Sequence, residues 1–106
     1  MGMQAERIDD LVARIVQAVH PLRILLFGSA ARGDSNEASD VDVLVVMPEG
    51  IHRRRTAQSI YAQTWNLGVP VDVVVATPSD LDKYRDTPGL IYRSILREGR
   101  ELYVSS

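Results

Sequence analysis

The chain has 106 residues with 14 acidic and 12 basic side chains, which gives a formal net charge of −2 at pH 7. Its 45% hydrophobic and 25% charged residues are typical of a folded globular protein and exclude an intrinsically disordered one. A nearly balanced charge also lacks the basic field that holds nucleic acid by neutralising phosphates, so we expect no bulk nucleic-acid binding. The absence of cysteine excludes a disulfide scaffold, a thiolate metal site and a cysteine nucleophile.

The length predicts one domain over residues 1–106, long enough to form a single core. No apolar run approaches the roughly 18 to 20 residues of a membrane span, and the first residues do not resemble a signal peptide. We therefore expect a cytoplasmic protein.

The first predicted element is an amphipathic helix over residues 5–19, which Pro21 is expected to end. A short apolar run then predicts a strand at residues 23–27. The helical pattern consists of apolar side chains at i, i+3, i+4, i+7, i+8 and i+11, namely Ile8, Leu11, Val12, Ile15, Val16 and Val19.

After this strand, Gly28-Ser29 is expected to open a short turn of helix, whose first backbone N–H groups are available to an anion. Residues 34–39 are a polar loop without a predictable shape. A second strand is predicted at residues 41–47. It is apolar on both faces beyond Asp42, which is typical of a strand covered on two sides.

The second half of the chain continues the alternation of helices and strands. Its predicted elements are a helix over 52–66 that buries Ala57, Ile60, Tyr61 and Trp65, a strand at 71–75, a short helix over 79–84 with a capping box from Ser79 to Asp82, a helix over 89–98 and an edge strand at 102–104. This order predicts an α/β or α+β fold with a small sheet and helices packed on it.

Aspartates interrupt the two apolar strands of the middle of the chain. Asp40 and Asp42 project from the same face of a strand, because side chains alternate along it. Asp72 lies inside the run V-D-V-V-V, where a buried carboxylate without a partner is costly. If the two strands are neighbours in register, the three carboxylates meet at one sheet edge and suit Mg²⁺ or Mn²⁺. The alternative is that Asp72 binds a nearby arginine or backbone amide and the other two are solvated.

The spacing of Gly28 and Gly33 superficially fits the start of a phosphate-binding P-loop. In that motif the following positions are Lys and Ser or Thr, whereas this chain has Asp34-Ser35. An aspartate in place of the lysine that binds the phosphates argues against a P-loop.

The stretch G-S-A-A-R-G-x5-S-D-x-D resembles the signature of the DNA polymerase β-like nucleotidyltransferase superfamily, and specifically its minimal nucleotidyltransferase (MNT) domains. Asp72 falls where this family has its third carboxylate, and the similarity extends over nearly the whole chain. The matching signature positions are Gly28, Ser29, Arg32, Gly33, Ser39, Asp40 and Asp42.

The resemblance implies a mixed sheet flanked by helices, with ATP as substrate and two Mg²⁺ ions, or Mn²⁺, as cofactors. It implies that Asp40, Asp42 and Asp72 are catalytic metal ligands, and that Asp72 also helps to deprotonate the acceptor. Gly28 and Ser29 would bind the β- and γ-phosphates, Ser39 would shape the loop before Asp40, and Arg32 and Gly33 belong to the same nucleotide-binding segment. For Arg32, a phosphate contact and a structural role are equally open.

Short MNT proteins act beside a helical HEPN-family toxin, onto a tyrosine of which they transfer AMP from ATP. The resemblance therefore implies a type VII-like antitoxin that forms a homo- or hetero-oligomer. Two alternatives stay open. One is a non-catalytic module that regulates a helical partner by contact, and the other is nucleotidyl transfer to a small molecule.

Other conspicuous residues have simpler interpretations. Arg53-Arg54-Arg55 is expected to be a solvated helix start, with a partner or RNA contact as the alternative. Arg93, Arg97 and Arg100 are spaced as a helical stripe that is more simply a solvated face than a triphosphate or partner contact. Trp65 and Tyr61 are expected in the core rather than on a base-stacking surface.

Overall fold

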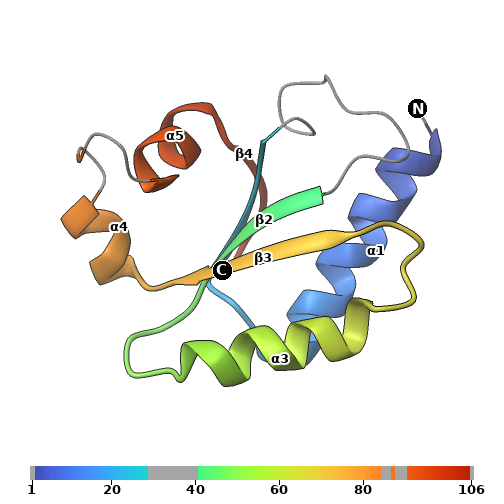
Figure 1. Ribbon diagram of the computed structural model, residues 1–106, viewed down its shortest axis with the longest axis horizontal. Coiled ribbons are helices and arrows are strands. Elements are labelled where there is room, and N and C mark those ends of the chain that lie inside the picture. Colours follow the sequence, from blue (N-terminus) through green and yellow to red (C-terminus); the bar gives the residue numbers. More distant parts are fainter. Residues whose placement is uncertain (1, 29–40, 85–86, 88–90, 106) are drawn as a thin grey trace.

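A computed structural model describes residues 2–28, 41–84, 87 and 91–105. Within these ranges the chain forms helices and strands that largely follow the predicted alternation (Figure 1). The elements are α1 (Gly2–Val19), β1 (Arg23–Phe27), β2 (Val41–Val46), α3 (Arg53–Thr64), β3 (Val71–Ala76), α4 (Pro78–Tyr84), α5 (Ile91–Glu98) and β4 (Arg100–Val104).

The strands form a mixed sheet with the order β3-β2-β1-β4. β1 is antiparallel to both β2 and β4, whereas β2 and β3 run parallel. This arrangement confirms the expected α+β fold with a small mixed sheet and helices beside it. It also brings the end of β1 to the beginnings of β2 and β3.

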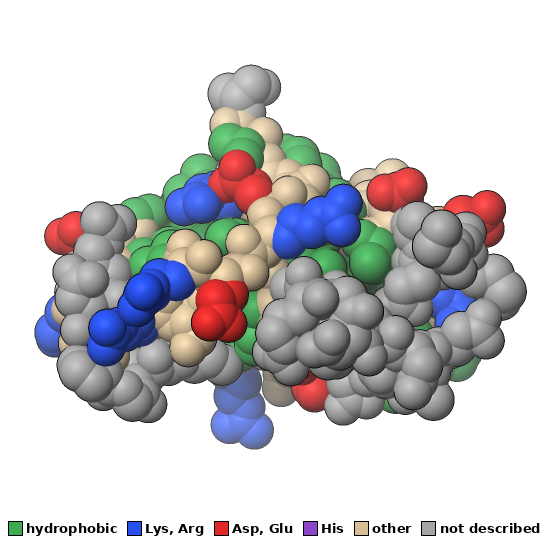
Figure 2. Space-filling model, turned by 90° about the horizontal axis from the view of Figure 1, so that it is seen from above, with side chains coloured by type: hydrophobic (Ala, Val, Ile, Leu, Met, Phe, Trp, Pro, Cys, Tyr) green, Lys and Arg blue, Asp and Glu red, His purple; other side chains and the backbone are tan. Residues whose placement is uncertain are grey.

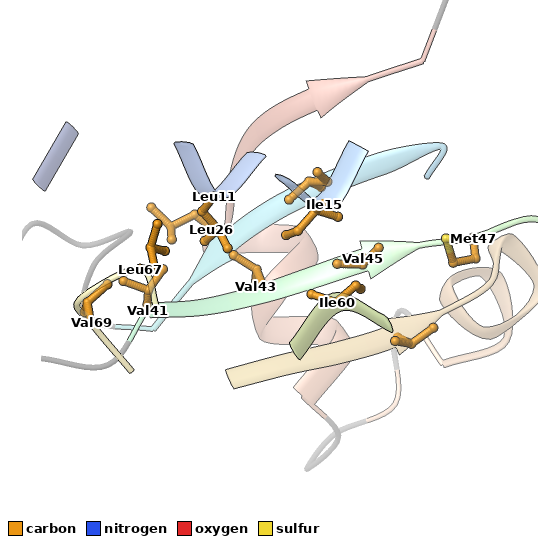
Figure 3. Close-up of a cluster of buried hydrophobic side chains, with 12 residues drawn as sticks. Leu11, Ile15, Leu26, Val41, Val43, Val45, Met47, Ile60, Leu67 and Val69 are labelled. Atoms are coloured by element: carbon orange, nitrogen blue, oxygen red, sulfur yellow. The ribbon is translucent and has the colours of Figure 1, made fainter. Parts of the chain in front are cut away.

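Helices cover both faces of the sheet. On one face, Val41, Val43 and Val45 of β2 pack against side chains of α1 and α3, including Leu11 and Ile60 (Figure 3). On the other face, alternate residues of the same strands pack against α4 and α5 in a cluster made of Leu25, Leu44, Val46, Ala76, Leu81 and Ile95. The prediction that the second strand is covered on two sides is therefore confirmed, and its period of two assigns each side chain to a face.

The prediction that the helix after residue 52 buries Tyr61 and Trp65 is wrong. α3 ends at Thr64, and its inward side is formed by Thr56, Ile60 and Thr64. Tyr61 is 41% exposed and Trp65 is 81% exposed. Tyr61 and Trp65 each lie one position after a residue of this inward side, so the helical period turns their side chains about 100° away from it.

The predicted capping box of the short helix is displaced by two residues. Thr77, rather than Ser79, precedes α4, and its Oγ1 accepts a hydrogen bond from the Asp80 N–H while Asp80 accepts one from the Thr77 N–H. These reciprocal bonds form a capping box with Pro78 at the first helical position, where a proline is favourable because no N–H is needed. Asp82, the predicted partner of Ser79, is exposed.

The terminal elements are close to those predicted. α1 begins earlier than expected and ends at Val19, and β4 is an edge strand paired with β1. Across the described ranges, no helix has the length and apolar character needed to cross a membrane.

Candidate active site

Three strand ends meet at one edge of the sheet, and each of them carries or adjoins a residue predicted from the sequence. Phe27, the last residue of β1, pairs with Asp42 near the start of β2. Asp42 pairs in turn with Asp72 near the start of β3. Because neighbouring strands lie about 4.8 Å apart, this register makes the two aspartates direct neighbours.

Both aspartates belong to the face of the sheet that packs on α4 and α5. Leu44 and Val74, two residues further along their strands, contribute to the apolar cluster on that face. Side chains two residues apart share a face, so Asp42 and Asp72 continue the same rows to the sheet edge. Asp42 is half-buried and Asp72 is exposed. The carboxylate of Asp72 lies at the start of β3, and the residues of β3 that follow it are apolar.

Gly28 fits closely against Asp42. Its φ angle of +74° is in the left-handed region, where residues with a side chain are strained. A Cβ atom at this position would collide with the Asp42 carboxylate. The first glycine of the signature therefore lets the backbone leave β1 in direct contact with one of the acids.

The other predicted site residues, Ser29, Arg32, Gly33, Ser39 and Asp40, lie outside the described residues. Asp40 directly precedes Val41, whose N–H donates to the Pro70 carbonyl at 2.9 Å, so the start of β2 is fixed beside the segment that enters β3. The described ranges, which omit Asp40, contain no cluster of three or more His, Cys, Asp or Glu side chains suited to a metal ion. The neighbouring Asp42 and Asp72 supply hard oxygen donors of the type that Mg²⁺ and Mn²⁺ prefer.

A second group of charged side chains lies at the opposite ends of β2 and β3 and holds the start of α4. Oε2 of Glu49 accepts a hydrogen bond from the Ser79 N–H at 2.8 Å, and hydrogen bonding to Ser79 lowers the pKa of Glu49. Partial burial acts to raise the pKa of Asp80, but the bond from the Thr77 N–H and the ion pair with Arg53 lower it overall. Sequence reasoning missed this group, although the T-x-x-D spacing from Thr77 to Asp80 signals it.

The predicted arginine clusters have different surroundings. Arg53, Arg54 and Arg55 are all exposed at the start of α3, as expected for a solvated helix start, and Arg53 pairs with Asp80. Figure 2 views the molecule from above and shows acidic and basic side chains interspersed over that face. The predicted stripe of Arg93, Arg97 and Arg100 does not form on one helix, because α5 ends at Glu98 and Arg100 begins β4. Arg97 is exposed in the last turn of α5, and Arg93 is half-buried.

The model of a nucleotidyltransferase domain family matches residues 7–102 of the chain. A candidate protein adenylyltransferase of Methanocaldococcus jannaschii is 63% identical over 27 residues, which are 26% of this chain and 27% of that protein. The chain is thus aligned with little more than a quarter of this curated relative.

Solved structures have the same fold. A structure described as a candidate minimal nucleotidyltransferase has a TM-score of 0.63 at 29% identity, with 93% of this chain and 92% of that chain covered. A candidate nucleotidyltransferase from Sulfolobus solfataricus has a TM-score of 0.65 at 18% identity, with 97% and 85% covered. A toxin–antitoxin structure with AMP-PNP has a TM-score of 0.59 at 18% identity, with 93% and 74% covered.

Proposed function

The chain belongs to the nucleotidyltransferase domain family, and we propose that it transfers AMP from ATP to a hydroxyl group of a partner protein. The observation that carries this proposal is the pairing of Asp42 with Asp72 at a sheet edge where Gly28 contacts Asp42. Two carboxylates side by side repel each other unless a cation lies between them, which favours a divalent ion at this position.

In the proposed site, Asp42 and Asp72 would hold Mg²⁺ together with Asp40, the preceding acid of the signature. Divalent ions bound there would neutralise charge on the leaving pyrophosphate and lower the pKa of the attacking hydroxyl. Ser29 and the backbone at Gly28 would bind the β- and γ-phosphates, Gly33 would belong to the same nucleotide-binding segment, and Ser39 would shape the loop before Asp40. Arg32 contacts a phosphate or fixes that acidic segment.

The reaction is a substitution at the α-phosphorus of ATP. The acceptor hydroxyl oxygen forms a new P–O bond, the bond from the α-phosphorus to the bridging oxygen breaks, and pyrophosphate leaves with that electron pair. Asp72, which is exposed and therefore reachable by a protein acceptor, takes the hydroxyl proton. The products are the AMP ester of the acceptor and pyrophosphate.

Two relatives support a protein as the acceptor. The relative from Methanocaldococcus jannaschii is named as a candidate protein adenylyltransferase, and one structural neighbour is a toxin–antitoxin complex with an ATP analogue. We accordingly propose a type VII-like antitoxin whose acceptor is a tyrosine of a helical HEPN-family toxin encoded beside it.

The test is label transfer from α-³²P-ATP with Mg²⁺ to the protein encoded beside this chain. We expect labelled partner with the wild type and with Asp82→Asn, an exposed aspartate of α4. We expect none with Asp42→Asn. Absence of transfer with the wild type, or transfer that survives Asp42→Asn, contradicts the proposal.

Two further measurements test the alternatives. Neutralisation of the partner that persists in Asp42→Asn would favour a module that acts by contact. A screen of small hydroxyl acceptors tests transfer to small molecules.

A further inference from the structure

A side chain from α3 reaches the outer edge of β3 beside one of the acids. β3 is the end strand in the order β3-β2-β1-β4, so one of its edges has no strand beside it within the described part of the chain. The Tyr61 hydroxyl oxygen accepts a hydrogen bond from the Val73 N–H at 2.9 Å. Figure 1 shows α3 running alongside β3. Tyr61 thus takes the place of a neighbouring strand at the residue that directly follows Asp72.

The backbone of β3 shows how this bond bears on Asp72. The Ala76 carbonyl accepts a hydrogen bond from the Met47 N–H at 2.8 Å, so the backbone groups of position 76 face β2. Backbone groups along a strand face its two edges in turn, so those of Asp72 face β2 as well, whereas those of Val73 face the outer edge. The peptide unit that joins Asp72 to Val73 is therefore held between β2 on one side and Tyr61 on the other.

The Asp72 side chain depends on its backbone for its position. It is exposed, and it belongs to the second residue of an edge strand, where a strand opens most easily. Groups behind a metal ligand fix the orientation of that ligand and raise the affinity of the site. A bond that fixes the backbone directly after Asp72 therefore also fixes the direction in which its carboxylate points.

Tyr61 is well suited to this contact. Ile60, the preceding residue, is fully buried and anchors this turn of α3 in the core. Tyr61 is turned about 100° away from it and reaches the sheet edge. Its ring has only two side-chain torsions, so little conformational freedom is lost when the hydroxyl is held in place. A phenylalanine would have the same shape but no hydrogen-bond acceptor.

We propose that Tyr61 is a positioning residue, which holds Asp72 through the Val73 N–H in the place where its carboxylate binds a divalent cation beside Asp42. This inference rests on the proposed function, because it takes Asp72 as a metal ligand. Tyr61 acts here through the backbone and has no part in the chemical step.

The test is the affinity for Mg²⁺–AMP-PNP, measured by calorimetry. Tyr61→Phe keeps the ring and removes the hydroxyl, and it is expected to weaken binding about tenfold, the lower end of what groups behind metal ligands contribute. Tyr84→Phe is the matched control, because Tyr84 is a helical tyrosine whose ring stacks on Tyr92, beyond the opposite end of β3. If Tyr61 acts through Asp72, Tyr61→Phe causes no further loss when it is added to Asp72→Asn.

Amide hydrogen exchange gives a second readout that needs neither metal nor nucleotide. In the metal-free protein, the Val73 amide is expected to exchange faster in Tyr61→Phe than in the wild type. The Met47 amide, bonded at the opposite end of β3, is the internal reference and should exchange at the same rate in both.

Equal affinities of Tyr61→Phe and Tyr84→Phe would overturn the inference, as would an unchanged exchange rate of the Val73 amide. An equal loss of affinity in the Asp72→Asn background would give Tyr61 a general structural role and also overturn it. If binding of Mg²⁺–AMP-PNP depends on Tyr61 but the wild type transfers no label, the proposed function fails and the positioning role stands. Label transfer by a wild type whose affinity does not depend on Tyr61 removes only the positioning role.

Discussion

Gly28 and Asp42 approach so closely that a methyl group has no room between them. A Cβ atom at position 28 would overlap Oδ2 of Asp42. Gly28→Ala is therefore expected to displace the Asp42 carboxylate and to weaken binding of Mg²⁺–AMP-PNP by at least about tenfold, because changes even in the outer shell of a metal site cost 10- to 100-fold. The positive φ angle adds a loss of stability of about 1–2 kcal/mol.

Gly50 offers a matched control for this substitution. Its φ is +86°, but nothing lies within 4 Å of the position of a Cβ atom. Gly50→Ala should thus lose a similar amount of stability in denaturant unfolding while it binds the nucleotide like the wild type. Equal nucleotide affinity of the two variants would show that Gly28 does not position Asp42.

Asp72 lends itself to a test of the metal site that does not depend on an acceptor. Like charges on neighbouring strands are unfavourable, so Asp72→Asn should leave metal-free stability unchanged or raise it by a few tenths of a kcal/mol. Mg²⁺ at ten times its Kd should stabilise the wild type by about 1.4 kcal/mol, which raises Tm by several degrees. The variant should show much less of this rise. An equal response of Asp72→Asn and wild type to Mg²⁺ in thermal unfolding would remove Asp72 from the metal site.

The register that joins Asp42 and Asp72 shows what the sequence could and could not predict. The apolar runs around both residues predict buried strands with an acid at each start. That β2 and β3 are parallel neighbours in register depends on tertiary packing, which no local pattern encodes. From the sequence alone, the metal site can therefore be predicted only on the condition that the two strands are neighbours in register, so that the acids meet.

Two local predictions failed for identifiable reasons. The segment before Asp82 contains two overlapping capping patterns, and the one from Thr77 prevails because it places Pro78 at the first helical position. Hydrophobicity predicts Trp65 in the core, but it lies one position after Thr64, the last residue on the inward side of α3, and therefore faces away from the core. Hydrophobicity alone cannot distinguish an aromatic residue of the core from one on the surface.

The contrast between Ile60 and Trp65 can be measured directly. Ile60 is fully buried between α3 and the sheet, so Ile60→Ala should lower the free energy of unfolding by about 2–5 kcal/mol. Trp65→Ala should change it by no more than about 0.5 kcal/mol, because its side chain is mostly in solvent. Denaturant unfolding checks both values. A large loss in Trp65→Ala would contradict the exposed position of its side chain.

The charged group at the start of α4 predicts how stability depends on pH. The pKa values of Asp80 and Glu49 are lowered in the folded protein, so the unfolded chain binds more protons as the pH falls through about 4. The stabilisation by these carboxylates is therefore complete above about pH 5 and is lost as the pH falls toward 3.

Asp80→Asn removes the charge that pairs with Arg53 and should cost about 1 kcal/mol at pH 7. Unfolding at several pH values should show a smaller loss between pH 5 and pH 3 in Asp80→Asn than in the wild type or in the control Asp82→Asn, and identical slopes in all three would contradict this role of Asp80.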